Sequence, residues 1–354
     1  WEMIEKDSFK VFLANSGTAF EVPFLKRLKD LSDEVCPVVK DRRTGAEYPV
    51  LAALVDHKLK ELDYKLAVSH EVEFIGYNHP DGKRTYLRSL CFVLQNAVRR
   101  IYPDKVLIIN HSLPSGLYCT ICEKEPLEDG RRAVHELDDN ALVQLKEEMR
   151  SIVSADLPFT KVKMEAAAAE ELFLANGQPD KAALLKSLGV LICSVYYLDG
   201  QADTFHGPLL PSTGYLKVFD LMPYGEGFCL QFPSDNDFNK VIPVRKQSRI
   251  ASTLMDYADW CSIIGVNGIG TLNKAVLAGE ASRLINLAEA LHERNYAAIA
   301  DKIYEKRGQV KIVFIAGPSS SGKTSSSLRL ALQCRVLGLQ PKVIELDNYF
   351  VDRE

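Results

Sequence analysis

The stretch Gly317-Pro318-Ser319-Ser320-Ser321-Gly322-Lys323-Thr324 matches the P-loop pattern G-x-x-x-x-G-K-[ST] at every fixed position. Residues 310–316 (VKIVFIA), which precede it, are apolar and largely β-branched, as is typical of a buried parallel strand. Residues 323–337 have the composition of a helix that packs on a sheet. The order of strand, glycine loop and helix directs backbone N–H groups and a helix N-terminus towards a polyphosphate. The sequence therefore predicts a nucleotide-binding loop on a parallel sheet.

Each residue type in this loop has a chemical role. Gly317 and Gly322 allow a close backbone approach that a Cβ atom would block. The Lys323 ammonium would contact the β- and γ-phosphates of ATP, and the Thr324 hydroxyl would ligate Mg²⁺. The predicted nucleotide-binding residues are Gly317, Ser319, Ser320, Ser321, Gly322, Lys323, Thr324 and Ser325. The alternative is a Gly- and Ser-rich connector that matches the pattern by accident.

A second apolar segment, residues 342–346, predicts another strand, and it ends in Asp347-Asn348-Tyr349-Phe350. Here the chain resembles the uridine kinase family of P-loop kinases. The resemblance implies that Asp347 is the general base or orients the acceptor hydroxyl, and that Tyr349 and Phe350 contact the substrate. The alternative for Asp347 is a cap of the turn after the strand.

A P-loop kinase domain needs on the order of 150–200 residues to cover its sheet on both faces. Few residues follow Gly317, so we expect an active kinase in the full-length protein and an inactive truncated domain in this chain.

The composition is that of an ordinary globular protein. The chain has 354 residues and a net charge of −4, so no global basic field attracts nucleic acid. No apolar run approaches the roughly 18 residues that span a bilayer, and a membrane partner is not expected. The eight cysteines are scattered, which favours reduced thiols in the cytoplasm. Cys119 and Cys122 form one C-x-x-C pair without a second pair at zinc spacing, so no zinc site is predicted.

Hydrophobic periodicity predicts several further elements. Strand-like pieces lie at residues 10–13, 51–55, 64–66, 73–75 and 106–109. Helices are expected at residues 24–28, at 87–101 before Pro103, after a cap at Asp138 or Asp139, and at 165–176 before Gly177. Residues 250–307 are expected to be helix-rich, with a buried stripe formed by Leu284, Leu287, Leu291, Ile299 and Ile303.

Two further resemblances cover most of the remaining chain. The segment LAALVDHKLKELDYKLAVSHEVEFI at residues 51–75 resembles a TGS domain, which is a small β-grasp module. Three pieces at residues 88–106, 154–188 and 203–214 resemble the editing domain of threonyl-tRNA synthetase. The implied domains are a TGS-like domain (1–77), an editing-like domain (78–235), a helical connector (236–308) and the start of a P-loop kinase domain (309–354). The fold class is therefore multidomain, α+β followed by α/β.

The editing-like domain departs from the family pattern at its chemical centre. The H-x-x-x-H pair of that family falls on Arg88 and Phe92, its Cys falls on Phe205, and its final His falls on Leu209. Two phenylalanines and a leucine cannot position a hydrolytic water, so the resemblance implies a degenerate site without zinc. His206 lies beside this segment, and a single His is more often structural than catalytic.

The favoured function at this point is phosphoryl transfer from ATP to a hydroxyl of a small molecule, with a nucleoside as the expected substrate. A nucleotide-sensing or RNA-associated regulatory protein is the alternative, and an editing hydrolase is the third reading. RNA is the less favoured partner because the basic doublets at residues 99–100, 131–132 and 245–246 have acidic neighbours. The sequence leaves open the phosphoryl acceptor, the role of the two N-terminal domains and the oligomeric state.

Overall fold

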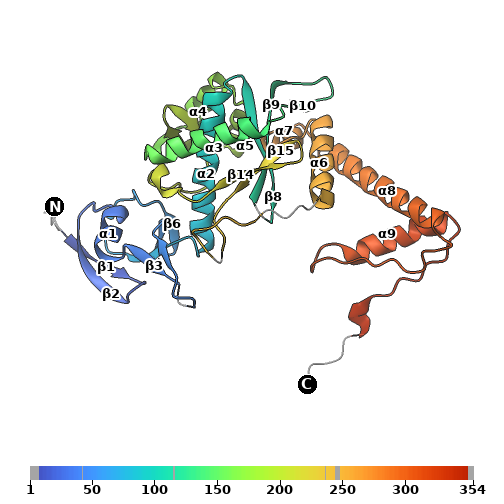
Figure 1. Cartoon of the computed structure of the whole chain (residues 1–354), viewed down its shortest axis with the longest axis horizontal. Coiled ribbons are helices and arrows are strands. Elements are labelled where there is room, and N and C mark those ends of the chain that lie inside the picture. Colours follow the sequence, from blue (N-terminus) through green and yellow to red (C-terminus); the bar gives the residue numbers. More distant parts are fainter. Residues whose placement is uncertain (1–7, 42, 115, 236, 244–247, 350–354) are drawn as a thin grey trace. The chain divides into compact units, whose positions relative to one another are not determined.

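The chain forms two units, residues 1–273 and 274–354, and each is considered separately. The computed structural model describes residues 8–41, 43–114, 116–235, 237–243 and 248–349 (Figure 1). Within them the architecture is mixed α+β, with several small open sheets. None of the described helices is both long enough and apolar enough to cross a bilayer.

The first unit begins with a five-stranded sheet in the order β2-β1-β7-β5-β6, in which β1 and β7 run parallel. Val11 and Leu13 of β1 are buried, whereas Phe12 between them is exposed, which is the alternation of a half-buried strand. The elements of this region are β1 (Ser8–Leu13), β2 (Thr18–Pro23), α1 (Leu28–Val35), β3 (Val38–Lys40), β4 (Glu47–Pro49), β5 (Ala52–Val55), β6 (Lys58–Lys60) and β7 (Glu71–Ile75).

Two local predictions in this region are wrong. Residues 64–66 contain no strand apart from an isolated bridge between Arg27 and Lys65. The helix begins at Leu28, where the segment predicted to be helical ends. Leu25 has a positive φ of 61°, so the helix cannot start as early as the apolar pattern suggests.

The helix α2 is the centre of the larger core of this unit. It packs with α3 against a sheet in the order β10-β9-β15-β14, and β8 pairs with β9. The predicted cap is present, because the Asp138 carboxylate accepts a hydrogen bond from the Ala141 N–H at 2.7 Å. The elements here are α2 (Pro80–Ile101), β8 (Lys105–Leu113), β9 (Gly116–Pro126), β10 (Arg132–Val134), α3 (Asp139–Ser154), η1 (Thr213–Tyr215), β14 (Asp220–Tyr224) and β15 (Gly227–Gln231).

A smaller layer lies on the same unit. Its antiparallel sheet has the order β11-β12-β13, and two helices pack on it around the fully buried Phe173. The first of these helices ends before Gly177, which has the positive φ of 68° expected after a helix C-terminus. The elements are β11 (Thr160–Glu165), α4 (Ala166–Ala175), α5 (Pro179–Leu188), β12 (Ile192–Leu198) and β13 (Gln201–Asp203).

The predicted helix-rich region is present and is formed by α6 (Ser248–Ile263), α7 (Ile269–Leu277) and α8 (Ala281–Glu305). The predicted buried stripe of α8 is wrong, because Leu287 and Ile299 are exposed and the one fully buried side chain of the helix as described is Ala300. Within the second unit α8 packs on α9 (Lys323–Val336) (Figure 1). Leu328 and Leu332 of α9 are exposed.

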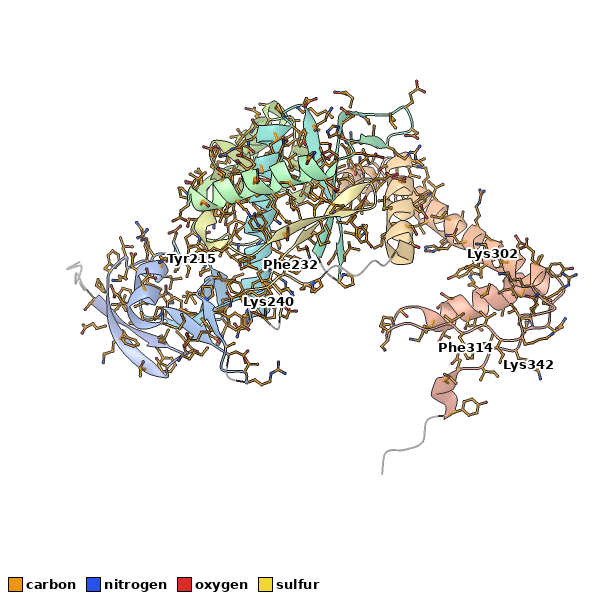
Figure 2. All side chains as sticks on the ribbon, in the orientation of Figure 1. Tyr215, Phe232, Lys240, Lys302, Phe314 and Lys342 are labelled. Atoms are coloured by element: carbon orange, nitrogen blue, oxygen red, sulfur yellow. The ribbon has the colours of Figure 1, made fainter. Side chains whose placement is uncertain are left out.

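The two predicted strands around the glycine loop are also wrong. Residues 310–316 and 342–345 have no regular secondary structure, and η2 (Leu346–Tyr349) follows. Phe314, labelled in Figure 2, is 85 % exposed. A strand needs a neighbour for its N–H and C=O groups, and neither segment pairs with another among the described residues. The parallel sheet expected here is therefore not formed.

We predict that Gly82→Ala destabilises the first unit by about 1–3 kcal/mol through overpacking. A Cβ atom on Gly82 would lie 2.0 Å from the Gly76 carbonyl oxygen, at the entry to α2. Gly268→Ala is the control, because a Cβ atom there meets nothing within 4 Å. Urea unfolding followed by circular dichroism tests this, and equal stability of the two variants would contradict it.

Candidate functional site

The glycine loop has the backbone shape that its residue types permit. The helix α9 begins at Lys323, directly after Gly322 with a φ of 78°. Ser320 also has a positive φ, of 61°, which is uncommon for a residue with a side chain. Of the predicted nucleotide-binding residues, Lys323 is half-buried and the others are exposed.

The side chains of this loop contact the loop itself. The Lys323 ammonium donates to the Pro318 carbonyl oxygen at 2.7 Å, and the Ser321 N–H donates to the same oxygen at 3.3 Å. A Cβ atom at Gly317 would lie 2.6 Å from the Ser321 hydroxyl oxygen, so a larger residue there would require that hydroxyl to move. The Lys323 ammonium must leave the Pro318 carbonyl if it is to contact a phosphate.

The predicted acceptor contacts are less well defined. Asp347 and Tyr349 lie in η2, and the Tyr349 side chain is 72 % exposed. Phe350 lies outside the described residues. The roles assigned to these three residues rest on the resemblance to kinases and stay predictions.

The four positions of the editing-like pocket do come together. Phe92 is fully buried, and its ring centroid lies 5.2 Å from that of Phe205 and 5.9 Å from that of Phe159. Leu209 is buried in the same core. Aromatic and aliphatic side chains therefore occupy the positions where the resemblance places polar groups.

Arg88 is the polar residue among these four positions, and its guanidinium forms hydrogen bonds with other groups of the protein. Its guanidinium donates to the Pro208 carbonyl oxygen at 3.1 Å and to the Thr85 hydroxyl at 3.0 Å. Burial lowers the pKa of Arg88. Gly207 is required beside it, because a Cβ atom there would lie 2.8 Å from the guanidinium carbon. His206 is exposed.

A buried ion pair close to this pocket escaped the sequence analysis. The Asp203 carboxylate, 1 % exposed, pairs with the Lys181 ammonium and accepts from the Thr204 N–H at 2.6 Å. Burial lowers the pKa of Lys181 although the Asp203 charge opposes this shift. Burial also raises the pKa of the Cys91 thiol, next to Phe92, to about 12, and the Asp203 charge adds to that shift. In the sequence, the feature that could have suggested this pair is Asp203, an acidic residue at the start of the segment at residues 203–214.

In each of the two described basic doublets, one arginine is paired with a carboxylate. Arg100 pairs with Glu148 at 2.6 Å and with Asp199 at 2.7 Å. Arg131 pairs with Asp129 at 2.7 Å. The doublet at residues 245–246 lies outside the described residues.

A different basic feature lies on β11. Lys161 and Lys163 alternate along this exposed strand. The Lys161 ammonium pairs with Glu61 at 2.9 Å and lies 5.6 Å from the ring centroid of Tyr196, which contacts Phe205 edge-on. Lys161 therefore borders the aromatic pocket, and Lys163 lies two residues further along the same strand.

Within the described part of the chain, no group of three or more His, Cys, Asp or Glu side chains is placed to hold a metal ion. Cys119 and Cys122 are both buried free thiols on β9.

Comparison with curated proteins finds threonine–tRNA ligases. The chain is 30% identical over 189 residues to the enzyme of Desulforamulus reducens, which is 53% of this chain and 28% of the relative. It is 28% identical over 173 residues to that of Carboxydothermus hydrogenoformans (49% of this chain, 26% of the relative) and 29% identical over 168 residues to that of Halorhodospira halophila (47% and 25%). The chain thus spans between a quarter and a third of the length of these relatives. No family model matches the chain.

These relatives support a threonyl-tRNA synthetase-like region and correct the expectation of an enzyme of the uridine kinase type. That expectation is wrong, because the relatives are threonine–tRNA ligases and not kinases.

We predict that Phe92→Ala costs about 3–5 kcal/mol of stability, because it removes a fully buried ring that packs on Phe159 and Phe205. Phe24→Ala is the matched control, since Phe24 is 54 % exposed and should change stability by about 0.5 kcal/mol or less. The unfolding midpoint in urea measures both, and a stable Phe92 variant would show that the pocket is not a packed core.

Proposed function

We propose that this chain is an RNA-associated binding protein whose synthetase-like domain, residues 78–235, recognises tRNA without hydrolysing an aminoacyl ester that the tRNA carries. The observation that carries the proposal is the similarity to threonine–tRNA ligases over about half of the chain. A tRNA partner also favours the cytoplasm. The division into domains 1–77, 78–235, 236–308 and 309–354, with a β-grasp TGS module first, is part of the same proposal.

The geometry of the pocket favours binding over hydrolysis. Phe92 and Leu209 are buried apolar side chains, and the guanidinium of Arg88 is held by Pro208 and Thr85. These groups offer no general base for water. The aromatic side chains fill the pocket, so an RNA would contact the surface beside it, where the exposed Lys163 of β11 would meet a phosphate; Lys161 on the same strand is already paired with Glu61.

We predict that Lys163→Glu weakens binding of a tRNA of the threonine type by about tenfold at low salt, because a phosphate contact is replaced by a repulsion. Lys10→Glu is the control, with the same charge change on an exposed residue of β1. Fluorescence anisotropy with labelled tRNA at several salt concentrations measures both.

The wild-type affinity should fall as salt rises, since bound phosphates release counterions. A flat salt dependence, equal effects of the two reversals, or release of the amino acid from mischarged tRNA would contradict the proposal.

A nucleotide-sensing role for residues 317–325 is a second proposal. It is supported by the left-handed Gly322, by the start of α9 at Lys323 and by the exposure of the loop. Gly317 and residues 319–325 would bind the phosphates of ATP, with Thr324 as the Mg²⁺ ligand. This proposal concerns binding alone.

We predict that Lys323→Ala lowers the affinity for MgATP by roughly 10- to 100-fold, because a charge-assisted contact is worth about 1.5–3 kcal/mol. Lys342→Ala is the control, since this exposed lysine lies outside the loop. Isothermal titration calorimetry compares the variants. Unchanged affinity in Lys323→Ala would remove the loop as the nucleotide site.

A further inference from the structure

The helices α8 and α9 are in contact through a small apolar core and three polar interactions. Ala300 of α8 packs with Leu330 and Cys334 of α9 in one buried cluster. Around it, Glu293 accepts from Gln333 at 2.9 Å and pairs with Arg329 at 3.0 Å. The third link is a hydrogen bond of 3.0 Å between the hydroxyls of Tyr296 and Ser326.

The position of Ser326 distinguishes this third link from the other two. The Ser326 N–H donates to the carbonyl oxygen of Gly322 at 2.8 Å, which closes the first turn of α9. Ser326 is therefore tied by its backbone to the loop and by its side chain to α8. Arg329 and Gln333 lie further along α9, where they can hold the two helices together without contacting the first turn.

We propose that Tyr296 is a positioning residue that sets the first turn of α9, and through it the loop amides, for nucleotide binding. The inference rests on the proposed nucleotide-sensing role of residues 317–325. Phosphate binding draws on the N–H groups of the loop and of the first helical turn, whose direction depends on the orientation of that turn. Because the Ser326 side chain joins the first turn to Tyr296, occupancy of the loop and order in α8 are coupled, and the coupling acts in both directions.

The Tyr296 ring and hydroxyl are half-buried, so removal of the hydroxyl alone leaves the packing of the ring in place. Tyr296→Phe and Ser326→Ala each delete one partner of the bond. Tyr304→Phe is the matched control on α8, because Tyr304 lies under the Arg307 guanidinium at 4.3 Å and not in the cluster with α9. Gln333→Leu is the control for loss of a polar contact between the two helices that does not involve the first turn of α9.

The experiment uses the full chain and titrates MgATP and inorganic tripolyphosphate by calorimetry. Tyr296→Phe and Ser326→Ala should each weaken binding about three- to tenfold, as expected for one hydrogen bond, and the double variant should lose no more than either single variant. Tyr304→Phe and Gln333→Leu should bind as the wild type does. Binding is compared at a temperature where circular dichroism shows every variant folded.

Hydrogen exchange distinguishes the proposed coupling through Tyr296 from simple packing of α8 on α9. MgATP should slow amide exchange in α8 of the wild type and of Gln333→Leu, and should leave α8 of Tyr296→Phe unchanged. If the wild type binds MgATP and Lys323→Ala weakens it, yet Tyr296→Phe matches the wild type in affinity and exchange, this inference alone is overturned. If the wild type binds neither MgATP nor tripolyphosphate, the proposed nucleotide site is overturned and this inference with it.

Discussion

The polar groups buried along α2 constrain the whole of the first unit. A hydroxyl or amide that leaves water must find a partner, or its desolvation costs about 1–3 kcal/mol. On α2 the partners come from distant segments: Asn96 donates to the Leu198 carbonyl oxygen at 3.0 Å, and the Ser89 hydroxyl accepts from the Leu210 N–H at 2.9 Å. Tyr86 likewise donates to the Val218 carbonyl oxygen at 2.9 Å. These bonds join α2 to the end of β12 and to the loops at Leu210 and Val218, and the Oδ1 atom of Asn96 has no hydrogen-bond partner within the described protein.

Some of these bonds also fix the backbone beside the pocket of Phe92, Phe205 and Leu209. The segment that ends at Leu210 is held to α2 by the bond from the Leu210 N–H to the Ser89 hydroxyl and by the bond from Arg88 to the Pro208 carbonyl oxygen. The space between them is filled by Phe92, Phe205 and Phe159. Apolar side chains therefore form a packed core at these positions.

Local signals made much of the first unit predictable. The apolar spacing of α2 and the Asp138 cap of α3 depend on neighbours in sequence, and both elements are where the pattern places them. The pocket positions Arg88, Phe92, Phe205 and Leu209 followed from the resemblance, and the structure gathers them. The pair of Lys181 and Asp203 could not be found by spacing, because the two residues come from different elements and only the fold joins them.

In the second unit, local sequence signals did not predict the structure of the apolar segments around the glycine loop. An apolar, β-branched run such as residues 310–316 favours a strand, but a strand also needs neighbours that no local pattern reveals. The helices α8 and α9 required no such partner and are present. The buried cluster that joins them is small, with Ala300, Leu330 and Cys334 at its centre, which leaves long stretches of both helices in water.

The exposed run at residues 310–316 has a consequence for the behaviour of the protein at high concentration. It combines β-branched and aromatic residues, contains no proline and carries a single charge at Lys311. Ile312 and Phe314 are 68 % and 85 % exposed. Segments of this kind are templates for intermolecular β-sheet, because unpaired backbone groups of one chain pair readily with the same groups of another. Among the described residues this run is unpaired, so at high concentration its backbone groups are available to pair with an extended segment of another chain.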